Sequence, residues 1–72
     1  MEENNQTPKT IGQKIRIWRK KRKLTQEGLA RKADIPYTTL AKIESDNIQN
    51  PTLDTITKIA NGLEITLNEL TS

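Results

Sequence analysis

Residues 25–44 limit the possible folds of this chain more than any other stretch, because their pattern predicts two short helices joined by a tight turn. Their sequence is TQEGLARKADIPYTTLAKIE. Thr25 is a suitable N-cap for a helix over about residues 26–32. Pro36 has a fixed φ and no N–H, so it suits the start of a second helix over about residues 37–45. We therefore expect two helices that meet at a corner.

The apolar residues of this stretch fall on one face of each expected helix. In the first helix they are Leu29, Ala30 and Ala33, and in the second they are Leu40 and Ile43. Small residues in the first helix allow a close approach of its neighbour, as a helix–turn–helix corner requires. The second helix consequently turns four other side chains outward. They are Tyr37, Thr38, Ala41 and Lys42.

Three more helices are predicted around this corner. The first runs from the N-cap Thr10 to about Lys23 and carries an apolar stripe of Ile11, Ile15 and Trp18. After a loop at residues 45–52, Thr52 caps a helix over about residues 53–62. Its stripe is Leu53, Ile56, Ile59, Ala60 and Leu63. Thr66 and Glu69 form a capping-box sequence for a last helix that ends near Leu70. We expect an all-α, compact five-helix domain over residues 9–72, with residues 1–8 as a disordered N-terminal tail.

Charge is distributed unevenly along the chain. Residues 9–32 carry ten Lys or Arg against the single acid Glu27, whereas residues 33–72 carry two basic residues against six acids. Such an asymmetry favours a polyanionic partner, although a solvated basic helix would show it too. The chain has no His, no Cys, no glycine-rich phosphate loop and no paired carboxylates on one expected face. We therefore expect no enzyme activity, no cofactor and no metal site.

The outward face of the helix over residues 37–45 has the chemistry of a DNA-reading surface. A helix fits the major groove, where Lys42 can donate to guanine, Tyr37 and Thr38 can donate or accept, and Ala41 can touch a thymine methyl. Gln26 at the start of the preceding helix, with Gln49 and Asn50 in the following loop, can hold backbone phosphates. The alternative is an ordinary solvated helix face. The residues alone leave both interpretations open.

The run LTQEGLARKADIPYTTLAKIE, followed by NPTLDTITKIANGLEITLNEL, resembles the Cro- and phage-repressor-like, or Xre-type, family of helix-turn-helix regulators. This resemblance implies a lambda-repressor-like five-helix fold and operator binding as a homodimer. It also implies that Thr25 and Gln26 hold phosphates, that Thr39 points towards the DNA backbone, and that Tyr37, Thr38, Ala41 and Lys42 face the bases. A partly buried ion pair between Arg19 and Glu44 is implied as well. The family usually has Gly where this chain has Asp34 and Glu64, so both should adopt positive φ.

The leading hypothesis is a sequence-specific, double-stranded DNA-binding transcriptional regulator in the cytoplasm, with no membrane contact. We expect a repressor, although the sequence does not distinguish a repressor from an activator. The alternative is a protein-binding module, such as an antitoxin whose main partner is a toxin. An exposed apolar patch without self-association would favour that alternative. A homodimer would associate through the last helix, by Leu67 and Leu70, with Ile65 or Ile48 nearby, unless these residues simply close the core.

Overall fold

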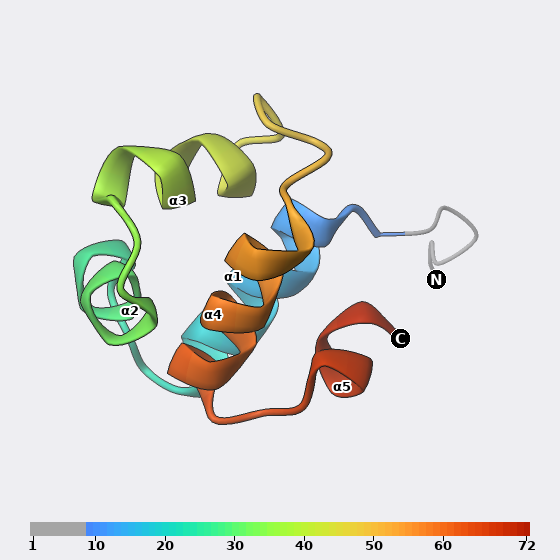
Figure 1. Cartoon of the computed structure of the whole chain (residues 1–72). Helices are drawn as coiled ribbons and strands as arrows, with labels where there is room; N and C mark the ends of the chain where they lie inside the picture. The colour runs from blue at the N-terminus through green and yellow to red at the C-terminus, as the bar shows by residue number, and fades with distance from the viewer. Residues whose placement is uncertain (1–8) are drawn as a thin grey trace, which may run out of the picture.

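The computed structural model describes residues 9–72, which form five helices and no strand (Figure 1). The helices are α1 (Ile11–Lys21), α2 (Gln26–Ala33), α3 (Tyr37–Glu44), α4 (Leu53–Leu63) and α5 (Leu67–Thr71). In Figure 1, α2 and α3 lie on one side of α1 and α4, and α5 lies on the other. The predicted all-α, five-helix fold is confirmed, and the predicted tail at residues 1–8 lies outside the described residues. None of the described helices is long and apolar enough to span a membrane.

Threonine N-caps start four of the five helices. They are Thr10, Thr25, Thr52 and Thr66, and each side chain accepts a hydrogen bond from the N–H three residues ahead. All four were predicted, as was the capping box that Thr66 forms with Glu69. A second capping box between Thr10 and Gln13 was not predicted. These bonds satisfy N–H groups that have no partner within the helix.

Left-handed residues follow four of the helices, and none of them is glycine. They are Lys23, Asp34, Asp46 and Glu64, with φ between 58 and 67°. Positive φ was expected at Asp34 and Glu64 but not at the other two. The first helix therefore stops at Lys21 rather than near Lys23, because the Leu24 N–H turns back to the Arg19 carbonyl. This is the Schellman end of a helix, which normally selects glycine.

The core is built from the inward faces of all five helices. Seven side chains are fully buried: Ile15, Leu29, Leu40, Ile43, Ile59, Leu63 and Leu70. Ile11 and Trp18, the other members of the predicted α1 stripe, are only partly buried against this cluster. The prediction that Leu53 belongs to the α4 stripe is wrong, since it is 68 % exposed. As the first residue of α4 it precedes the part of the helix that other elements cover, and the stripe begins at Ile56.

Two glycines allow helices to approach one another closely. A Cβ on Gly12 of α1 would clash with the backbone carbonyl oxygen of Ile43 in α3. A Cβ on Gly62 of α4 would lie 3.0 Å from the Ala33 nitrogen in α2. The close packing predicted for the small residues of α2 thus occurs chiefly against α4. The contact at Gly12 fixes the distance between α1 and α3.

Candidate nucleic-acid interface

Helix α3 presents the polar face that the sequence predicted. Leu40 and Ile43 are fully buried, which turns the opposite side of the helix to solvent. Tyr37 is 47 % exposed, Thr38 and Lys42 are exposed, and Ala41 is half-buried. The four residues assigned to base reading therefore share an accessible face. That they contact bases stays a prediction.

The turn before α3 sets the direction of this helix. Asp34 adopts φ 60°, and the Ile35 N–H donates to the Ala30 carbonyl, which closes α2. Pro36 lies at the N-cap position of α3 with φ −62° and makes no side-chain capping bond. The N–H groups at the start of α3 are thus left without a side-chain cap, and they are donors directed out of the helix.

Gln26 lies at the start of α2, where the sequence placed a phosphate-binding amide. Thr25 accepts the Gly28 N–H at 2.9 Å, as an N-cap should. The Gln26 Nε2 donates to Glu44 Oε1 at 3.1 Å, a contact that was not predicted. One amide hydrogen is thereby committed to the protein, while the second hydrogen and the carbonyl oxygen are free for other partners. Thr39, the other expected backbone contact near this helix pair, is half-buried.

Glu44 joins three segments of the chain. Its side chain is 3 % exposed and receives Arg19 Nε at 2.8 Å and Arg19 Nη2 at 3.1 Å, a two-bond pairing. Arg19 Nη1 also donates to the Leu24 carbonyl at 2.8 Å. With the bond from Gln26, the carboxylate receives three donors. The charge of Glu44 is therefore paired, and α1, the start of α2 and the end of α3 are held together.

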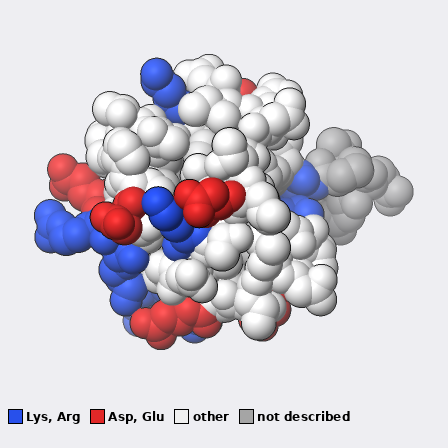
Figure 2. All heavy atoms as spheres, viewed as in Figure 1, with Lys and Arg blue, Asp and Glu red and all other residues white. Residues whose placement is uncertain are grey.

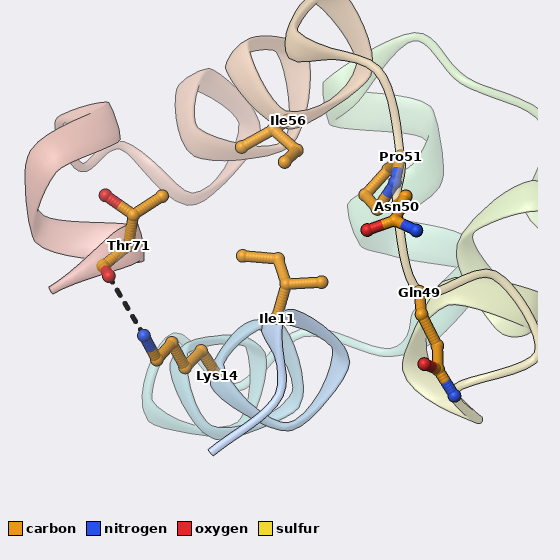
Figure 3. A pocket seen from close by; sticks show the side chains of 7 residues that line it. All are labelled: Ile11, Lys14, Gln49, Asn50, Pro51, Ile56 and Thr71. Atoms are coloured by element: carbon orange, nitrogen blue, oxygen red, sulfur yellow. Dashed lines mark hydrogen bonds between the residues drawn. The ribbon is translucent and has the colours of Figure 1, made fainter. Parts of the chain in front are cut away.

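Gln49 and Asn50 line a hollow that Gln26 does not border (Figure 3). This hollow measures about 320 Å³ and lies between α1, α4, the end of α5 and the loop after α3. Its other lining residues are Ile11, Lys14, Pro51, Ile56 and Thr71. Figure 3 shows Ile11 and Ile56 facing one another and Lys14 Nζ donating to the Thr71 carbonyl, at 2.9 Å. Both Gln49 and Asn50 are exposed, so they are accessible to a ligand.

Charges on the face drawn in Figure 2 are of both signs. Cations and anions alternate near the α2 edge, and much of the remaining surface is uncharged. Helix α4 lies in front of α1 in this view, so the basic residues of α1 are not its central feature. The visible face therefore does not offer a continuous positive surface for a polyanion.

The chain is similar to a phage repressor and to a family of helix-turn-helix proteins. The helix-turn-helix family matches residues 15–70. The immunity repressor protein of Bacillus phage phi105 is 44 % identical over 61 residues, which cover 85 % of this chain and 42 % of that protein. This chain thus spans less than half the length of that curated relative.

Solved structures of the biofilm regulator SinR have the same fold. SinR in complex with DNA has a TM-score of 0.82 and 28 % identity, covering 88 % of this chain and all of that chain. The N-terminal DNA-binding domain of SinR from Bacillus subtilis has a TM-score of 0.81 and 29 % identity, covering 86 % of this chain and 90 % of that one. The complex of the SinR and SinI proteins has a TM-score of 0.80 and 30 % identity. The match covers 85 % of this chain and 59 % of that one. With a match over most of its length, the chain belongs to the helix-turn-helix family of Xre-type regulators.

Proposed function

We propose that this chain is a sequence-specific, double-stranded DNA-binding transcriptional repressor that reads the major groove with α3. The observation that carries the proposal is the exposed polar face of α3, held by a buried apolar face in a fold shared with a DNA-binding domain. The phage relative is named an immunity repressor, and the SinR relative was solved with DNA. These comparisons lend no support to the antitoxin alternative. Neither the family nor these relatives are enzymes.

In vitro selection from random duplex DNA tests this function. A repressor of this kind should enrich one consensus, and a dimer should enrich two inverted half-sites about 34 Å, one helical turn, apart. A variant with Tyr37→Ala, Thr38→Ala and Lys42→Ala should lose the consensus while keeping its helical circular dichroism spectrum. Recovery of no consensus by the unaltered chain would contradict the proposal.

The homodimer belongs to this proposal, and for two of the residues considered for its surface the alternative, that they close the core, is the one the structure favours. Leu70 is fully buried and Ile65 is 8 % exposed, because both close the core between α4 and α5. Leu67 and Ile48 are half-buried. Within residues 9–72 the large apolar side chains that remain exposed are Ile17, Tyr37 and Leu53. Sedimentation equilibrium with and without the selected operator would measure the association state.

Lys42→Ala should weaken binding to the selected operator by about 1–3 kcal/mol and relax the preference at one base pair. The reason is that Lys42 is exposed on α3 and makes no ion pair within residues 9–72. Titrations of labelled duplexes, each with one base pair changed, would measure this. If binding to operator and to random duplex fell equally, Lys42 would contact a phosphate instead.

Gln26→Ala should weaken binding to operator and random duplex to a similar degree, because a backbone contact carries no sequence information. The change also removes one donor from Glu44, so its thermal unfolding has to be measured alongside. Thr52→Ala is the control, since it removes an N-cap from α4 without touching α2 or α3. A loss confined to the operator would show that Gln26 is not a backbone contact.

A further inference from the structure

A second hollow lies beside α3, between three helices. It measures about 250 Å³ and lies where α1, the start of α2 and the end of α3 meet. Its lining residues are Arg16, Arg19, Gln26, Ala41, Glu44 and Ser45. Two of them, Gln26 and Ala41, were predicted to contact DNA, whereas Arg16 was not assigned to any site. Arg16 lies one helical turn before Arg19, so the two share a face of α1.

The charges around the hollow leave one cation uncompensated. Arg19 donates to Glu44 and to the Leu24 carbonyl, and the positive charge of Arg19 offsets the negative charge of Glu44. Arg16 is exposed, and within residues 9–72 its guanidinium makes no hydrogen bond or ion pair. The lining thus has one net positive charge, and the group that provides it is accessible. A planar guanidinium can donate two parallel hydrogen bonds to a phosphate.

The position of the hollow relative to α3 indicates which phosphate would reach it. An α-helix is about 10–12 Å across and the major groove is about 12 Å wide, so a seated helix has a DNA strand directly beside it. Ala41 belongs to α3 and lines the hollow together with Gln26. A strand that passes Gln26 therefore also passes Arg16.

We propose that this hollow binds one phosphodiester group of the DNA backbone and that Arg16 supplies its cation, with Gln26 on the opposite wall. The inference rests on the proposed DNA-binding function, and it adds Arg16 to the phosphate contact already expected of Gln26. Glu44 has a positioning role here: it holds the Gln26 amide at the hollow and is itself neutralised by Arg19.

Salt dependence of DNA binding tests the assignment. Arg16→Gln should lower the slope of log Kobs against log salt concentration by about 0.9 and weaken binding roughly tenfold near 0.1 M salt. The loss should be equal on the selected operator and on random duplex. Lys58→Gln removes the same charge from α4, where Lys58 is paired with Asp54, and should change the slope by less than half as much. Arg16→Lys keeps the charge and should keep the slope.

A methylphosphonate scan locates the phosphate. Neutralising one backbone position of the operator should weaken binding by the unaltered chain and weaken binding by Arg16→Gln much less at that same position, because only the Gln26 contact remains there. Equal effects of Arg16→Gln and Lys58→Gln, a loss confined to the operator, or loss of the slope in Arg16→Lys would each overturn the inference. Absence of salt-dependent duplex binding by the unaltered chain would instead overturn the proposed function itself.

Discussion

Gly12→Ala should lower the free energy of unfolding by about 2 kcal/mol, a large part of what keeps this small domain folded. The new Cβ would clash with the Ile43 carbonyl oxygen and would lie 2.9 Å from Asp46 Oδ1, so α1 and α3 must move apart. Ala stabilises a helix by about 1 kcal/mol relative to Gly, but forcing an extra methyl group against backbone in a packed interface costs about 3 kcal/mol. A single small core supplies only about 3–5 kcal/mol of net stability. Urea titration followed by circular dichroism would measure the loss.

Gly28→Ala is the matched control for this experiment. It makes the same substitution in the first turn of α2, where the new Cβ would meet the Thr25 hydroxyl at 3.1 Å and a Leu24 methyl at 3.8 Å. These are side-chain atoms that can adjust, so helix propensity should dominate. We expect unchanged or slightly raised stability, by up to about 1 kcal/mol. Similar urea midpoints for both variants would refute the role assigned to Gly12.

Arg19→Met should destabilise the fold by about 3–5 kcal/mol, because it leaves the charge of Glu44 buried with only the Gln26 amide as a partner. The two side chains of the pair are 13 % and 3 % exposed, so water replaces the lost guanidinium only in part. Restoring an apolar pair with Arg19→Met and Glu44→Met together should recover much of the stability. Thermal unfolding of the single and double variants would measure both effects.

The exposed ion pair between Lys32 and Glu64 is the control for the buried pair between Arg19 and Glu44. Its side chains are 45 % and 71 % exposed and their charged atoms are 3.2 Å apart. Water screens such a pair, so Lys32→Met should change stability by less than about 1 kcal/mol. If Arg19→Met were no worse than Lys32→Met, the network around Glu44 would be loose in solution.

The sequence predicted the helices well because their starts are encoded locally. A threonine N-cap and the apolar period that follows it are both visible within a dozen residues, as at Thr52 and Ile59. Helix ends were less predictable. Lys23 and Asp46 occupy positions where a glycine would have indicated a helix end. Because neither is glycine, only the backbone of the folded chain shows that they are left-handed.

The candidate site was predictable in its types of residue but not in its tertiary contacts. The exposed face of α3 follows from the burial of Leu40 and Ile43 three residues apart. The bond between Gln26 and Glu44 joins residues that are 18 positions apart, and no local pattern encodes it. The clash at Gly12 likewise depends on how closely α1 crosses α3. The spacing of Arg16 and Arg19 on one helix face was an available signal for the second hollow.

The hydrogen-bond network around Glu44 affects how α3 would bind DNA. Since α3 is fixed to α1 and to the start of α2 by charge-assisted bonds, its direction is set before any DNA is present. Binding then requires the ordering of surface side chains rather than of a helix, which lowers the entropic cost of association. Such a rigid reader cannot tilt to fit a poor site, so adaptation to sequence falls on the DNA, through bending and groove width.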